Sequence, residues 1–217
     1  MLRIRERSGL GPLLWAGLAS GGMVALGWGV DARRRARETR RMHRTLVDLL
    51  LNALTADDAP TARHSRRVAD LSYALAGACG YRGADLSRLR VAALMHDLGK
   101  LDDRFFDILR SGRKLTDAQR AEMEKHPRES AHILGPLEKL HPGITAVVAA
   151  HHERWDGEGY PAGLAGDAIP REARIIAIAD VFDALSQRRT YHEPMPVDDV
   201  LEELARSAGT QFDPQLV

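Results

Sequence analysis

The chain has a single cysteine, Cys79, among 217 residues, so it cannot form an internal disulfide or build a metal site from several thiolates. No segment of useful length alternates apolar and polar residues, which argues against a β-sheet. No internal repeat is present, and the net charge is only +1. These absences leave a helical protein with one sizeable core and an appendage.

Charged residues are also absent from residues 8–30. A helix of that length could cross a hydrocarbon layer of roughly 30 Å. Within it, Gly17 and Gly21 have the small-xxx-small spacing that lets membrane helices approach closely. We therefore expect a membrane anchor over residues 1–31. A secretory signal is disfavoured because no Ala-x-Ala site precedes the arginines that follow, and a buried soluble helix is the alternative left open.

A basic segment over residues 32–45 follows the expected anchor. Three arginines precede the span, and more follow it. Those that follow include Arg33, Arg34, Arg35, Arg37, Arg40 and Arg41. The positive-inside rule therefore places the C-terminal side in the cytoplasm and predicts a single-pass membrane protein. The block contains no aromatic residue, so nucleic-acid binding is disfavoured and anionic lipid headgroups are the expected contact.

Apolar residues recur at three-to-four-residue spacing through residues 46–217, which predicts one domain made of amphipathic helices. A capping box from Thr116 to Gln119 marks one helix start, and Gly99 and His126-Pro127 mark two expected helix ends. Helices are expected near residues 46–54, 64–75, 86–98, 116–125, 144–152, 171–187 and 197–207. The predicted fold class is an all-α bundle.

Two motifs place imidazoles beside other metal-binding or charged groups: His96-Asp97 with Lys100, and His151-His152 before a glycine-rich loop. Neighbouring residues at a helix end point about 100° apart, so they can serve two adjacent ions, with Asp97 as the bridge. Two ions about 3.5–4 Å apart suit in-line displacement at phosphorus. Asp180 follows the apolar run 175–179, where an unpaired carboxylate would be costly.

Together with His64-Ser65-Arg66-Arg67-Val68 and His126-Pro127, these motifs occur in the order found in the HD-GYP domain, which residues 46–217 resemble. That branch of the HD phosphohydrolase superfamily hydrolyses cyclic di-GMP to pGpG and in some cases to GMP. The resemblance implies an HD-domain helical bundle, preceded here by one transmembrane helix. It also implies metal ligands at His64, His96, Asp97, His126, His151, His152 and Asp180.

The resemblance suggests further roles around these ligands. Asp97 and Lys100 are the expected catalytic residues, with Lys100 binding phosphate, and Arg189 matches a family position that grips substrate. Asp183 could contact substrate, hold a ligand histidine or make a helix-packing hydrogen bond, and the sequence leaves these open. Residues Gly159, Tyr160 and Pro161 should shape the mouth of the site and could contact partners such as diguanylate cyclases.

Imidazoles and carboxylates without thiolates favour two divalent ions of iron or manganese, although zinc, nickel and cobalt are compatible. Family members with a third metal carry a glutamate where this chain has Pro60, so a two-metal centre is predicted. The leading hypothesis is a cyclic di-GMP phosphodiesterase that could form a homodimer. A phosphohydrolase for another nucleotide and a non-catalytic cyclic di-GMP receptor are the alternatives.

Overall fold

The computed structural model describes residues 59–102, 104, 105, 108, 115–187 and 193–217, and a few single positions between residues 34 and 45. The chain divides into two units, Met1–Leu50 and Leu51–Val217. The predicted membrane span at residues 8–30 and the predicted helix at 46–54 lie outside the described residues. Among the described residues, no helix is both long enough and apolar enough to cross a bilayer.

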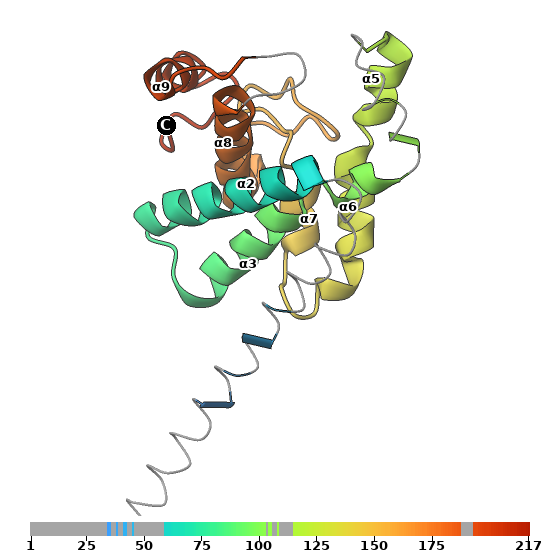
Figure 1. The fold of residues 1–217 in the computed structure, drawn as a ribbon, viewed down its shortest axis with the longest axis vertical. Coiled ribbons are helices and arrows are strands. Elements are labelled where there is room, and N and C mark those ends of the chain that lie inside the picture. The colour runs from blue at the N-terminus through green and yellow to red at the C-terminus, as the bar shows by residue number, and fades with distance from the viewer. Residues whose placement is uncertain are drawn as a thin grey trace, which may run out of the picture. The chain divides into compact units, whose positions relative to one another are not determined.

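The second unit is helical, and its described residues contain no strand (Figure 1). This confirms the predicted all-α fold for that part of the chain. In chain order the elements are α2 (Ala59–Ala78), α3 (Gly83–Met95), η1 (Leu98–Leu101), α5 (Asp117–Met123), α6 (His126–Leu134), η2 (Gly135–Leu137), α7 (Ile144–Ala149), η3 (Gly166–Ala168), α8 (Arg171–Ser186) and α9 (Val197–Arg206).

Helix α8 contacts α2, α7 and α9, and α2 also packs along α3 (Figure 1). The sequence of α8 explains its contacts, because Ile175, Ile176 and Ile178 point to different sides of the helix and all three are buried. One core cluster joins α2, α3, α8, α9 and the C-terminal segment: Ala76, Leu86, Leu89, Ile175, Ile178, Val200, Leu204, Phe212 and Leu216. The acidic residues Asp180 and Asp183 are therefore held on a helix that the core fixes in place.

Two helix ends differ from the prediction. Helix α3 ends at Met95, before Gly99, so His96 and Asp97 lie in the turn between α3 and η1. Helix α7 ends at Ala149, so His151 and His152 also follow a helix. Gly99 is instead a packing residue, since a Cβ there would lie 2.5 Å from the carbonyl oxygen of His126.

The region around His126 was also predicted incorrectly. The capping box of α5 is confirmed, with Thr116 and Gln119 bonded reciprocally, but α5 already ends at Met123. His126 begins α6 rather than ending a helix, and Pro127 occupies the first turn, where a missing N–H costs nothing. The motif imidazoles therefore project from helix ends, where neighbouring side chains can point toward one centre.

Candidate metal centre

Three of the predicted ligands, His96, His126 and His151, have the same local geometry. In each, ring atom Nδ1 faces the main-chain carbonyl oxygen three residues earlier, that of Ala93, Met123 and Val148 respectively, at 2.7, 2.6 and 2.6 Å. A carbonyl oxygen can only accept a hydrogen bond, so Nδ1 carries the proton and Nε2 keeps its lone pair. The backbone thus fixes the tautomer that can bind a cation through Nε2.

Asp97 lies where these lone pairs meet. Its Oδ1 is 3.2 Å from Nε2 of His126 and 3.7 Å from Nε2 of His151. Its Oδ2 is 3.4 Å from Nε2 of His96 and 3.9 Å from Nε2 of His64. The two oxygens of one buried carboxylate therefore face two different sets of imidazoles.

The structure brings all the predicted ligands together in two adjacent groups. One consists of Asp97, His126, His151 and His152, and the other of His64, His96 and Asp180. Within each group the potential ligand atoms lie within 4.8 Å of one another. Groups of three or four N and O donors at such distances could each hold a divalent cation.

Two buried atoms show that this arrangement fits a metal. Nε2 of His96 and Oδ1 of Asp97 are fully enclosed, yet neither has a hydrogen-bond partner among the residues that the structure describes. Burying polar atoms without partners costs free energy, and both atoms offer lone pairs toward the same centre. A cation in each ligand group would supply the missing partner, for Oδ1 of Asp97 in one group and for Nε2 of His96 in the other.

Comparison with known proteins identifies the family. A family model described as HD domain matches residues 48–216. The chain belongs to the HD domain family. Its likeness to an HDGYP protein from Bdellovibrio bacteriovorus, with a TM-score of 0.62 at 21% identity over 82% of this chain and 61% of that one, agrees with the fold.

Curated relatives share more of the sequence. The cyclic di-GMP phosphodiesterase response regulator RpfG of Xanthomonas campestris is 36% identical over 83% of this chain and 48% of its own length. The 3'3'-cGAMP-specific phosphodiesterase 2 of Vibrio cholerae is 38% identical over 87% of this chain and 35% of its own length. The chain thus spans half or less of these HD relatives, and the predicted family resemblance is confirmed.

Burial keeps most imidazoles of the HD site neutral. It lowers the pKa of His151 to about 4, and it also lowers the pKa of His126. Burial and the adjacent His151 ring lower the pKa of His152 well below its usual value. A neutral imidazole is the form that binds metals, so these three side chains are ready to act as ligands at neutral pH.

His64 differs because carboxylates surround it. Burial opposes its charged form, but Asp180, 3.2 Å from Nε2, and Asp183, 2.7 Å from Nδ1, raise the pKa of His64 to about 9. Burial alone would raise the pKa of Asp97, but its neighbours His96 and Lys100 hold it well below the usual range. Without a metal, the proton on His64 therefore offsets part of the negative charge of the site.

These shifts predict how the stability of the metal-free protein depends on pH. The pKa of His64 is about 9 when folded and near 6.5 when unfolded, so its stabilising effect is complete below pH 6.5 and is lost as the pH rises through about 9. The pKa of His151 is about 4 when folded, so stability falls as the pH drops from 6.5 toward 4. Urea unfolding of metal-stripped protein should give the highest midpoint near pH 6.5. In a His64→Gln variant the alkaline decline should shrink, and an unchanged decline would contradict this assignment.

Asp183 lies behind His64 rather than at the site opening. Its carboxylate is 1% exposed, accepts the Nδ1 proton of His64, and is bound on the other side by Arg67, whose Nη2 lies 2.9 Å from Oδ2. Of the roles left open by the sequence, this geometry favours holding a ligand histidine over contacting substrate. Arg67 was not predicted as a functional residue, although it lies one helical turn after His64.

We expect Asp183→Asn to lower metal affinity by about 10–100-fold, because groups that orient a ligand histidine typically have effects of this size. Arg67→Ala should cause a smaller loss in the same direction. Metal titration against a competing chelator measures both effects. Arg63→Ala is the matched control, since Arg63 is exposed on the same helix. Wild-type affinity in Asp183→Asn would show that Asp183 does not orient His64.

Lys100 also lies beside the centre. Its Nζ donates to Oδ2 of Asp97 at 2.8 Å, and its side chain is 21% exposed, so the ammonium lies between the ligands and solvent. A phosphate entering the site would meet this charge first. The predicted substrate residue Arg189 lies outside the described residues, and its role stays a prediction.

The loop after His152 forms one side of the site. The ring of Tyr160 lies 4.9 Å from that of His152, and Tyr160 N–H donates to the carbonyl of His152 at 3.2 Å. Gly159 is required here, since a Cβ would lie 2.3 Å from the backbone nitrogen of Arg154. Pro161 accepts a hydrogen bond from Arg128 through its carbonyl oxygen at 2.9 Å.

Glu153 is a functional residue that sequence reasoning missed. It is 4% exposed, and its two carboxylate oxygens accept the backbone N–H groups of Ala162 and Leu164 at 2.7 and 2.9 Å. It therefore fixes the loop that carries Tyr160 next to His152. One indication of its importance was visible in the sequence: Glu153 directly follows the paired histidines, and no role had been predicted for it.

Proposed function

We propose that this HD domain is a metal-dependent phosphodiesterase acting on cyclic dinucleotides, with cyclic di-GMP as the principal substrate. The observation that carries the proposal is Asp97, whose two oxygens face two adjacent groups of imidazole and carboxylate ligands. The names of the curated relatives, which include cyclic di-GMP phosphodiesterases, support the choice of substrate class.

In this proposal Asp97, His126, His151 and His152 hold one divalent ion, and His64, His96 and Asp180 hold a second beside it. Asp97 is shared between them. A pair of divalent ions held there would supply positive charge for the phosphate oxygens and would activate water for in-line attack at phosphorus. Iron or manganese is the proposed metal, because the donors are imidazoles and carboxylates.

The protein side chains have three tasks. Burial holds the pKa of His151 and of His152 below the usual value, so their lone pairs stay available as ligands near neutral pH. Lys100 binds a non-bridging oxygen of the phosphodiester, exchanging its contact with Asp97 for one with substrate. Tyr160 and the loop held by Glu153 close one side of the site and position the nucleotide.

Product chromatography after anaerobic loading with iron or manganese tests the proposal. Cyclic di-GMP should be converted to pGpG, with GMP as a possible further product, and metal-stripped protein should be inactive. Metal analysis of the same samples should give two ions per chain. Tight binding of cyclic di-GMP without product under these conditions would favour a non-catalytic receptor instead.

A second substrate has specific support. The relative that acts on 3'3'-cGAMP is 38% identical to this chain, slightly more than the 36% of the cyclic di-GMP phosphodiesterase RpfG. Comparing kcat/KM for the two cyclic dinucleotides decides between them. A higher value for 3'3'-cGAMP would assign the chain to that specificity while leaving the metal chemistry unchanged.

We also propose that residues 1–31 anchor the protein in the bacterial inner membrane, with the catalytic domain in the cytoplasm. The uncharged residues 8–30 and the arginines that follow support this topology. Retention of the full chain in membrane pellets after alkaline extraction would agree with it, and complete release would contradict it. A homodimer, and binding of diguanylate cyclases through residues 159–161, are further proposals for the full chain.

A further inference from the structure

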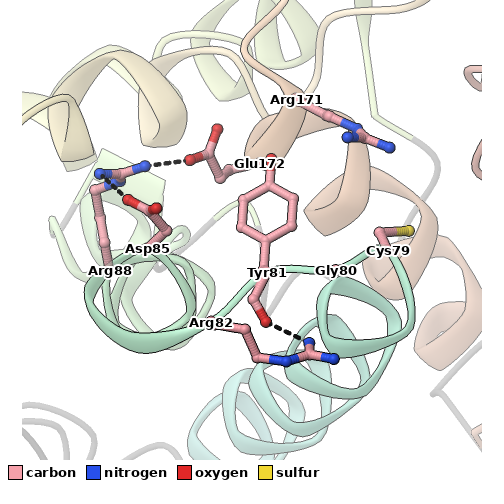
Figure 2. Close-up of a pocket in the computed structure, with 8 residues that line it drawn as sticks. All are labelled: Cys79, Gly80, Tyr81, Arg82, Asp85, Arg88, Arg171 and Glu172. Atoms are coloured by element: carbon pink, nitrogen blue, oxygen red, sulfur yellow. Dashed lines mark hydrogen bonds and ion pairs between the residues drawn. The ribbon is translucent and has the colours of Figure 1, made fainter.

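A pocket lies away from the metal centre, at the opposite end of α3 from His96. Its volume is about 540 Å³, within the range of small-molecule sites (Figure 2). Its walls come from the turn between α2 and α3, the first turns of α3, and the start of α8. On α8, Arg171 precedes Asp180 by about 13 Å at 1.5 Å per residue, so the two sites are separate.

Both carboxylates of this pocket are bound by the same arginine. Arg88 donates through Nη2 to Glu172, and its Nη1 lies 3.1 Å from the carboxylate of Asp85 (Figure 2). Both carboxylates are therefore engaged, although the single positive charge of Arg88 balances only one of the two. The other arginines in the pocket must therefore find different partners.

The other two arginines of the pocket contact neutral groups. Nη1 of Arg82 donates to the carbonyl oxygens of Gly77 at 2.8 Å and Tyr81 at 2.6 Å, which are neutral acceptors. The guanidinium carbon of Arg171 lies 6.0 Å from the centre of the Tyr81 ring, and Arg171 is exposed. Neither arginine forms an ion pair with a carboxylate among the described residues. Most of their N–H donors are thus available to a ligand.

We propose that this pocket binds a phosphomonoester dianion, with Arg82 and Arg171 as its charged contacts. The planar fork of a guanidinium matches the oxygens of a phosphate, and two such forks on opposite sides of Tyr81 suit a doubly charged group. Arg171 and Glu172 are also the first residues of α8, where the positive end of the helix dipole favours an anion.

Tyr81 adds a neutral contact between the two arginines. Burial is the main reason that the pKa of Tyr81 is raised, so its hydroxyl keeps a proton that it can donate to a phosphate oxygen. In Figure 2 its ring rises between Glu172 and Arg171, with Arg82 below it. The pocket thus offers both charged and neutral donors from separate elements.

The identity of the natural ligand, unlike phosphate binding itself, rests on the proposed function. Linear pGpG ends in a phosphomonoester, whereas cyclic di-GMP contains only phosphodiesters with one charge each. A pocket selective for the dianion would therefore bind the product of the reaction and not its substrate. The HD domain would then carry a product site distinct from its metal centre.

Cys79 provides a local probe, because it lines the pocket and is the only cysteine of the chain. We would measure the rate of its alkylation by iodoacetamide in the full, metal-stripped chain, with inorganic phosphate, GMP or uncharged guanosine added. Phosphate and GMP should slow alkylation saturably, and guanosine should not. Arg171→Ala should weaken protection by about tenfold, since it removes charge-assisted hydrogen bonds.

The matched control is Arg206→Ala, since Arg206 is exposed on α9 and contacts Glu203 rather than the pocket. Its protection should equal that of the wild type. Arg171→Lys, which keeps the charge but not the fork, serves if the alanine variant fails to fold, and should show weakened protection. The proposal would be overturned if neither phosphate nor GMP protected Cys79, or if guanosine protected it equally well. Full protection in the double variant Arg82→Ala/Arg171→Ala would also overturn it.

The alkylation assay does not need turnover. A negative result would therefore contradict the phosphate pocket without contradicting the phosphodiesterase proposal. The product step has its own comparison in the same assay. Protection by pGpG without protection by cyclic di-GMP would support product binding. Equal protection by both nucleotides would overturn selectivity for the phosphomonoester.

Discussion

Asp97→Ala should abolish hydrolysis of cyclic di-GMP, with a loss of kcat of at least about 10³-fold, and should strip both metals from the protein. The reason is geometric: the two oxygens of Asp97 face the two ligand groups, so one substitution removes a donor from each. Product chromatography measures the first effect and metal analysis of the purified variant measures the second.

The control for this substitution is Asp167→Ala, because the side chain of Asp167 is 91% exposed and contacts only Arg174 at the surface. That variant should keep wild-type activity and metal content. Circular dichroism should show that Asp97→Ala retains its helices. Normal hydrolysis by folded Asp97→Ala would refute the assignment of the metal centre.

Gly99→Ala should destabilise the domain by about 1–3 kcal/mol and reduce its metal content, although the glycine binds nothing itself. A Cβ at this position would lie 2.5 Å from the carbonyl oxygen of His126 and 2.8 Å from the backbone nitrogen of Ser130. Both are backbone atoms of α6, so the helix would have to move away from Asp97 and carry His126 with it. Urea unfolding and metal analysis test the two effects.

Gly77→Ala is the matched control for this glycine. Gly77 lies inside α2, and nothing lies within 4 Å of the Cβ it would gain. Its replacement should leave metal content unchanged and should not lower stability. If Gly99→Ala behaves in the same way, the close approach of α6 to the turn at Asp97 is not required for the centre.

The ligand set could be predicted because its chemistry is visible along the sequence. Adjacent His96-Asp97 and His151-His152 need no knowledge of the fold to suggest a metal, and the family resemblance added His64 and His126. Asp180 was identifiable because a carboxylate after an apolar run requires a partner. The all-α class followed in the same way from helical periodicity, as in α9, where Val200 and Leu204 are four residues apart and both buried.

Contacts between residues far apart in the chain could not be predicted. Asp183 on α8 holds His64 on α2, 119 residues away in the sequence. Arg67, also on α2, contacts the same carboxylate. Glu153 fixes a loop through backbone N–H groups, which carry no sequence signal of their own. Gly99 was assigned to a helix end because glycine often stops helices, but here tight packing against α6 explains it.

The ring-to-carbonyl hydrogen bonds of His96, His126 and His151 have a consequence for variation in this protein. Because the acceptors belong to the main chain, any amino acid could stand at positions 93, 123 or 148 without releasing the rings, as alanine, methionine and valine do here. Inserting one residue between acceptor and ring would instead rotate the imidazole by about 100° around the helix axis. Exchange at these positions should therefore leave the ring-to-carbonyl hydrogen bonds in place, whereas a change in length should not.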